Sequence, residues 1–271
     1  MGGMFSTNNN TNECCPANSW PVLPSTFDAA YEPKGEDITL LIESNNCPAY
    51  YVSATLPDAN KAIVVFNDVY GPTNRSKSVC DSLATMTGYH VISPDNFRGE
   101  TKDTAIADGT GVQKWLQKYP YDKVVGPDLA ACIGYLTSKG VDPANIGAVG
   151  FCWGGWAIVR ASATEGLLKC GVCPHPSTKI EKWAFSGSED DIASNVSAST
   201  PIFLMPAGND PDNVKPGGSV AEILKEKGGK CVVYEDMVHG WITRGDFTDV
   251  EVKKAADGAL AAAVDFLKEN M

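Results

Sequence analysis

The sequence predicts an α/β fold in which a mostly parallel, doubly wound sheet carries helices on both faces and an antiparallel edge. Three observations lead to this prediction. Short apolar segments alternate with helix-like segments along most of the chain. These segments are apolar throughout, which is typical of parallel strands that are buried on both faces. Two further strand-like segments precede the first helix, as expected for an antiparallel edge.

The predicted elements follow one another without a repeat or a linker after residue 13. The two leading strands are expected at residues 38–43 and 49–54. Turn residues bound the later strands, which are expected at residues 62–66, 90–93, 146–151, 170–173, 202–206 and 231–234. Helices are expected near residues 75–87, 110–118, 127–138, 154–165, 218–227 and 250–269.

A chain of 271 residues is within the size range of one α/β domain with a large core. Its first 13 residues are rich in Asn and Thr, which is typical of a flexible segment. We therefore divide the chain into a flexible N-terminal tail and leader at residues 1–29 and one α/β domain at residues 30–271.

The formal net charge of −11 argues against nucleic acid or an anionic membrane as the main partner, because both require a basic surface. No apolar run approaches the length of a membrane-spanning helix, and no secretory signal is visible. Several of the nine cysteines lie in apolar runs, which indicates reduced core thiols and a cytoplasmic location. The adjacent Cys14 and Cys15 lack a second ligand pair at zinc-site spacing, so no metal is expected.

The strongest chemical signal is the run Gly-Phe-Cys-Trp-Gly-Gly at residues 150–155, between a predicted strand and a predicted helix. This is the G-x-C-x-G form of a nucleophile elbow, in which flanking glycines make room for a sharp, strained turn. The turn would place Cys152 at a helix N-terminus, where the helix dipole and free N–H groups favour a thiolate. The alternative is a structural cysteine in a glycine-rich turn.

The sequence contains three histidines from which a base for this nucleophile can be chosen. His90 begins a strand, at the end of the sheet remote from a site, and is expected to be structural. His239 follows the last strand and comes after the nucleophile in the chain, which is the order of an α/β-hydrolase triad. His175 also follows a strand and is expected either to contact substrate or to support a loop.

The acid that orients the base should follow the strand at residues 202–206, where Asp210 and Asp212 both qualify. Asp210 comes first after a Gly-Asn turn and is the preferred candidate, with Asp212 as the substitute. Two backbone N–H groups are expected to form the oxyanion hole. These belong to Trp153, next to the nucleophile, and to Val69, in the loop after the strand at residues 62–66.

Taken together, these motifs resemble the dienelactone hydrolase family over roughly residues 30–270. The resemblance rests on the segments NDVYG (67–71), HVISPD (90–95), GFCWGG (150–155), AGND (207–210) and HGW (239–241). It implies the α/β-hydrolase fold, no cofactor, a Cys152–Asp210–His239 triad and a monomer or homodimer. The Cys-Cys-Pro leader at residues 14–16 makes the chain similar to a divergent, eukaryotic-type member.

The resemblance also suggests residues for substrate binding. Bacterial members carry glutamate where this sequence has Asp68, which is one methylene shorter. Arg98 and Arg244 occupy neighbourhoods similar to those of the family's ligand-binding arginines, and each could hold a substrate carboxylate or form a surface ion pair.

The sequence therefore predicts a cofactor-independent hydrolase that cleaves small lactones or activated carboxylic esters through a thioester on Cys152. The alternative is a scaffold without turnover that binds a ligand or senses redox state through Cys152. The intact acid and base speak against this alternative, because a sensor does not require them. A third option is transfer of the acyl group to an acceptor other than water.

Overall fold

The computed structural model describes residues 14–23, 31–43, 45–56 and 59–271. In this part of the chain, eight strands form one sheet in the order β1-β2-β4-β3-β5-β6-β7-β8. Their bounds are β1 Glu36–Leu40, β2 Cys47–Val52, β3 Ala62–Phe66, β4 His90–Pro94, β5 Ile146–Gly150, β6 Gly171–Pro174, β7 Ile202–Met205 and β8 Lys230–Cys231.

The sheet is parallel from β4 to β8, and β2 runs antiparallel to both β1 and β4. This confirms the mostly parallel sheet with an antiparallel edge. All residues of β3, β4 and β5 are buried, as required for central strands that are covered on both faces.

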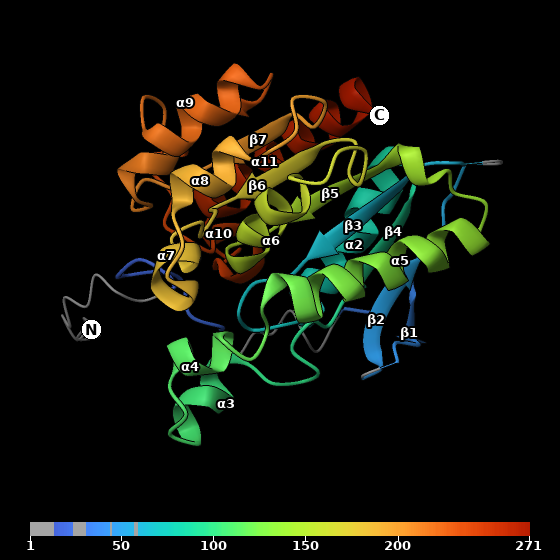
Figure 1. The fold of residues 1–271 in the computed structure, drawn as a ribbon, viewed down its shortest axis with the longest axis horizontal. Helices are drawn as coiled ribbons and strands as arrows, with labels where there is room; N and C mark the ends of the chain where they lie inside the picture. The colour runs from blue at the N-terminus through green and yellow to red at the C-terminus, as the bar shows by residue number, and fades with distance from the viewer. Residues whose placement is uncertain (1–13, 24–30, 44, 57–58) are drawn as a thin grey trace.

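Helices cover both faces of the sheet (Figure 1). Their bounds are α2 Asn74–Thr87, α3 Lys102–Ala107, α4 Val112–Leu116, α5 Gly126–Ser138, α6 Trp153–Ala161, α7 Ile180–Phe185, α8 Glu189–Ser194, α9 Ser219–Glu226, α10 Trp241–Arg244 and α11 Val250–Asn270. Shorter helical turns lie at Tyr121–Val125, Pro143–Asn145 and Asp212–Val214. Among the described residues, no helix is both long enough and apolar enough to cross a membrane.

The sheet separates two apolar cores. One core packs α5, α6 and α9 against the first face, and the other packs α2, α10 and α11 against the second. This arrangement is that of the α/β-hydrolase fold, as the sequence predicts. It brings the carboxyl ends of the parallel strands to one edge, where loops carry the candidate site.

Several predicted elements differ from those observed. The first strand, expected at residues 38–43, lies at Glu36–Leu40, and the short helices α3, α7, α8 and α10 were not predicted. The helix expected at residues 110–118 is shortened to α4, because Gly111 adopts a positive φ of 79° immediately before it. The strand expected at residues 231–234 is shortened to β8. The chain nevertheless stays beside β7, since Val232 N–H donates to the Leu204 carbonyl (3.0 Å).

The predicted tail at residues 1–13 lies outside the described residues, as do residues 24–30. Residues 14–23 of the predicted leader are described, and they lie against the domain. Cys14 and Cys15 are buried in the core on the α6 side of the sheet. The leader therefore contributes to packing at the carboxyl edge of the sheet.

Candidate active site

Cys152 occupies a strained turn between β5 and α6. Its φ of 54° and ψ of −110° are unusual for a residue with a side chain. The flanking glycines are required by close packing. A Cβ at Gly150 would lie 2.2 Å from the Gly154 carbonyl oxygen, and one at Gly154 would lie 2.4 Å from that of Phe66. The turn therefore has the geometry of a nucleophile elbow.

Asp210 and His239 form a buried pair at the neighbouring strand ends. Asp210 Oδ1 lies 2.6 Å from His239 Nδ1, and both side chains are inaccessible to solvent. The loop fixes each partner, because Asp210 Oδ2 accepts from the Ala207 N–H (2.7 Å) and Asn209 Oδ1 accepts from the His239 N–H (2.7 Å). Asp212, the alternative acid, has a fully exposed side chain that pairs with Lys215.

The ring of His239 lies beside two cysteine sulfurs. One of its nitrogens, Cys152 Sγ and a second sulfur all lie within 4.8 Å of one another. Because Nδ1 pairs with Asp210, Nε2 is the nitrogen left for this group. Burial lowers the pKa of His239, but the Asp210 carboxylate and its hydrogen bond, with smaller contributions from Cys15, outweigh burial and raise that pKa to about 9. With this pKa the imidazole holds a proton at neutral pH while the leader is in place, so it can stabilise a thiolate, and it accepts a thiol proton only from its neutral form.

The third member of that group is Cys15, which the sequence did not identify as a site residue. Cys15 Sγ lies 3.6 Å from Cys152 Sγ, and Cys14 Sγ lies 3.5 Å from Cys15 Sγ. The adjacent-cysteine motif was visible in the sequence, but the contact spans 137 positions and depends on the path of the leader.

Three hydrogen bonds that involve the backbone of the leader hold it over the pair formed by Asp210 and His239. Trp20 N–H donates to the His239 carbonyl (2.9 Å), and Asn209 Nδ2 donates to the Ala17 carbonyl (3.1 Å). The Ser177 hydroxyl donates to the Cys14 carbonyl (2.7 Å). The leader is thus attached to three separate loops of the site.

Ser177, which was not among the predicted site residues, also contacts Cys152. Its Oγ lies 3.4 Å from Cys152 Sγ. Because its single proton is directed to the Cys14 carbonyl, the hydroxyl can only accept from the Cys152 thiol. Burial and the Cys15 thiol raise the pKa of Cys152, so the protonated thiol is favoured while the leader is in place.

The two oxyanion candidates lie next to this turn in the fold. Trp153 is the first residue of α6, so its N–H is one of the helix donors without an intrahelical acceptor. Val69 is buried in the loop after β3. That loop is held by Asp68, whose Oδ1 accepts from the Tyr70 N–H (2.9 Å) and whose carbonyl accepts from the Gly71 N–H (3.0 Å).

Arg244 is a buried cation beside the site. Its Nη1 lies 3.6 Å from Asp68 Oδ2, which also accepts from the Thr243 hydroxyl (2.9 Å). Arg244 Nε and Nη2 are buried and have no hydrogen-bond partner among the described residues. Its positive charge lowers the pKa of Cys152 against the larger effect of burial. Nε and Nη2 lie beside Gly240, where an added Cβ would be 2.7 and 2.3 Å from them. Arg244 therefore has donors without a protein partner among the described residues, next to the backbone that follows His239.

Arg98 is committed to a structural ion pair. Its Nη1 and Nη2 donate to the two carboxylate oxygens of Asp128 at 2.8 and 2.7 Å, and Nη1 also donates to the Asp95 carbonyl (3.0 Å). We therefore leave Arg98 out of the proposed substrate site.

The other two histidines have different surroundings. His175 is fully buried, and its ring lies 4.7 Å from that of His239. Burial and the nearby charges of His239 and Arg244 hold the pKa of His175 well below its usual value, so it stays neutral. His90 is remote from this cluster and contacts the Tyr51 hydroxyl through Nδ1 (2.7 Å).

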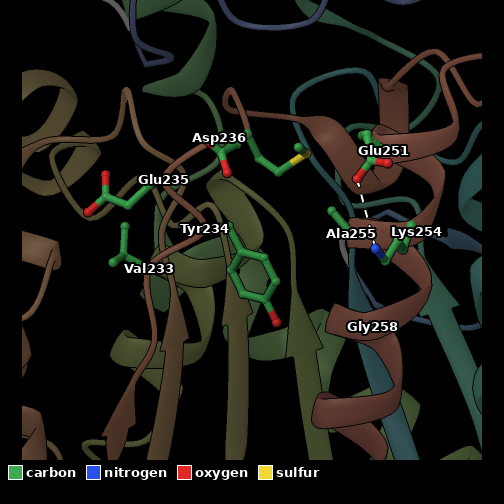
Figure 2. A pocket seen from close by; sticks show the side chains of 9 residues that line it. Val233, Tyr234, Glu235, Asp236, Glu251, Lys254, Ala255 and Gly258 are labelled. Carbon is green, nitrogen blue, oxygen red and sulfur yellow. Dashed lines mark ion pairs between the residues drawn. The ribbon is translucent and has the colours of Figure 1, made fainter.

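A separate surface pocket of about 740 Å³ lies between residues 233–237 and α11 (Figure 2). Its lining includes Tyr234 and the exposed ion pair between Glu251 and Lys254, as Figure 2 shows. It contains neither Cys152 nor His239, so we do not assign the chemistry to this pocket.

Comparisons with known proteins identify a family that matches most of the chain. Residues 48–271 match the model of the dienelactone hydrolase family. The hydrolase tropI of Talaromyces stipitatus is 28% identical over 218 residues, which cover 77% of this chain and 81% of that protein. The carboxymethylenebutenolidase homolog of Rattus norvegicus is 25% identical over 201 residues, or 72% of this chain and 76% of that protein.

The fold is also found in EstE1, a thermophilic carboxylesterase cloned from a metagenomic library. The two structures superpose with a TM-score of 0.60 at 18% identity, covering 88% of this chain and 92% of EstE1. The match to the family model includes the elbow, the Asp210 loop and His239. The chain therefore belongs to the dienelactone hydrolase family.

Proposed function

We propose that this member of the family hydrolyses small lactones or activated carboxylic esters through a thioester on Cys152. The observation that carries the proposal is the buried Asp210–His239 pair, with His239 Nε2 within 4.8 Å of a sulfur at a strained elbow. Nucleophile, acid and base follow one another in the chain in the order of an α/β-hydrolase triad.

The proposed reaction begins from the neutral form of His239, whose Nε2 accepts the proton of the Cys152 thiol. The sulfur attacks the carbonyl carbon, and the N–H groups of Val69 and Trp153 stabilise the oxyanion. The tetrahedral intermediate collapses, and His239 returns the proton to the departing alkoxide or ring oxygen. Water, deprotonated by His239, then hydrolyses the thioester. Asp210 keeps the imidazole oriented and stabilises its charged form.

A thiolate is also a good leaving group, so the first intermediate can expel Cys152 instead of the alcohol. The chemistry therefore favours substrates whose own leaving group is stabilised, such as enol lactones and aryl esters, over amides. Arg244 adds a preference for an acidic substrate, because its unpartnered Nε and Nη2 can bind a carboxylate. Asp68 positions Arg244, and neutral His175 packs against His239.

Steady-state hydrolysis of an aryl acetate and of an enol lactone tests the proposal. Cys152→Ala and His239→Ala should each abolish turnover in protein that keeps the wild-type circular dichroism spectrum. Near-wild-type activity in Cys152→Ala would exclude the thioester route.

All nine cysteines are free, which supports a reducing compartment such as the cytoplasm, and we propose no cofactor for hydrolysis.

One observation favours a second function, in which Cys152 senses redox state without turnover. The Cys15 thiol lies 3.6 Å from Cys152 Sγ in the buried cluster. Aryl-ester activity before and after mild peroxide distinguishes the two functions. Hydrolysis that is present in reduced protein supports the enzyme, whereas a thiol that oxidises in a protein without any activity supports the sensor.

A further inference from the structure

The leader converts the candidate active site into a cluster of soft metal ligands. Cys15 Sγ, Cys152 Sγ and His239 Nε2 all lie within 4.8 Å of one another, and the three residues are buried. Two sulfurs and one imidazole nitrogen form a donor set that is typical of zinc. We propose that these three residues bind a thiophilic divalent cation, Zn²⁺, which holds the leader closed over the nucleophile.

The distance between the two sulfurs fits a shared zinc ion. Two thiolates at about 2.3 Å from a tetrahedral zinc ion lie about 3.8 Å apart. The observed separation between Cys15 Sγ and Cys152 Sγ is 3.6 Å. A disulfide would require the sulfurs to approach to about 2.05 Å. The side chains are therefore already placed for a shared cation, whereas oxidation would require them to move.

His239 is prepared as a metal ligand by its surroundings. Its Nε2 is buried and has no hydrogen-bond partner among the described residues, which is uncommon for a buried polar atom. Its Nδ1 lies 2.6 Å from Asp210 Oδ1. A ligating histidine usually donates its other N–H to a carboxylate, which fixes the ring and directs the remaining lone pair to the metal.

Ligation also balances the charge within the cluster. It displaces the protons of two thiols and any proton on His239 Nε2, so binding of one Zn²⁺ releases up to three protons and leaves the ion with two thiolates and a neutral imidazole, without net charge. Cys14 Sγ is 3.5 Å from Cys15 Sγ but is not part of the group of three. We therefore assign three protein ligands, which leaves the fourth tetrahedral position to water.

The leader contributes Cys15, which has no role in the proposed hydrolysis. Hydrogen bonds from Ser177 to the Cys14 carbonyl and from Trp20 to the His239 carbonyl place Cys15 opposite Cys152. Zn²⁺ would occupy the lone pairs of both the nucleophile and the base. The metal-loaded protein should thus be inactive as a hydrolase, a consequence that rests on the proposed function, whereas metal binding itself does not.

Metal titration of chelator-treated, reduced full-length protein tests the site without any substrate. Wild type should bind one equivalent of Zn²⁺ with release of protons, and Co²⁺ should give thiolate-to-cobalt charge-transfer absorption. Cys15→Ser and His239→Ala should each weaken Zn²⁺ binding by at least about tenfold, the lower bound for losing an outer-shell partner. Cys231→Ser, outside the cluster and half-buried, is the matched control and should bind as wild type.

Absence of the cobalt–thiolate absorption, or unchanged affinity in Cys15→Ser, would overturn the proposal. So would a protein that binds no Zn²⁺ but loses two mass units under mild peroxide, which would identify Cys15 and Cys152 as a redox pair. Aryl-ester hydrolysis is measured separately in the metal-free protein. If that protein binds Zn²⁺ without hydrolysing esters, the proposed function fails and the metal site stands.

Discussion

Replacing Asp210 with Asn removes the charge that sets the protonation state of His239. Against burial, the Asp210 carboxylate and, to a smaller extent, Cys15 raise the pKa of His239 to about 9, compared with 6.5 for an unperturbed imidazole. At 1.36 kcal/mol per pKa unit, this difference corresponds to about 3 kcal/mol. In Asp210→Asn the largest attraction is lost while burial remains, so the pKa of His239 should fall.

The same perturbation has a defined effect on stability. A histidine whose pKa is raised on folding stabilises the protein fully below its unfolded pKa of about 6.5, and this stabilisation is lost as the pH rises through about 9. Wild type should therefore lose on the order of 3 kcal/mol of unfolding free energy between pH 6.5 and pH 9.5 from this residue. Asp210→Asn should lack that pH-dependent loss.

Two assays measure these effects. Titration of the imidazole resonances by NMR gives the pKa of His239, which His239→Ala assigns among three histidines. Urea unfolding at several pH values gives the stability. Asp212→Asn is the matched control, because the Asp212 side chain is fully exposed, and it should behave as wild type. An unchanged His239 pKa in Asp210→Asn would refute the electrostatic reasoning.

Three further predictions concern the elbow and the two arginines. Gly150→Ala places a Cβ 2.2 Å from the Gly154 carbonyl and should destabilise the fold by about 1–3 kcal/mol, so an unchanged urea midpoint would contradict the close packing. Arg244→Lys keeps the positive charge but loses the paired N–H donors of the guanidinium. The kcat/KM for a carboxylate-bearing ester should then fall about tenfold to a hundredfold relative to a neutral ester. Equal losses for both esters would exclude carboxylate recognition. Asp128→Asn removes the buried carboxylate that pairs with Arg98. The fold should lose about 3–5 kcal/mol of stability, while the kcat of the folded protein should stay unchanged. A selective loss of kcat would assign Arg98 to the site.

The parts of the site that the sequence predicted depend on local signals. The Cys152 elbow follows from glycines within two residues of the nucleophile, and His239 follows from its position after the last strand. The sequence favoured Asp210 and left Asp212 as the substitute, because both follow the same strand and the direction of the loop decides between them. The structure places Asp210 against His239 and exposes Asp212.

The local sequence could not predict contacts between segments that are far apart in the chain. Arg98 pairs with Asp128, 30 positions away, and nothing in the sequence around either residue indicates that contact. Cys15 reaches Cys152 across 137 positions, because the leader crosses the carboxyl edge of the sheet. The order of the strands was predictable only in outline, yet the mostly parallel sheet and its antiparallel edge are confirmed.

Intact-mass spectrometry during turnover shows whether Cys152 carries the acyl group. Metal-free protein is mixed with an aryl acetate, and wild type is compared with Cys152→Ser and His239→Ala. We expect an acetyl adduct on Cys152 that clears in wild type. Any adduct that forms in His239→Ala should persist, because deacylation lacks its base. Product release by wild type without an adduct, or an adduct on a residue other than Cys152, would exclude the thioester on Cys152.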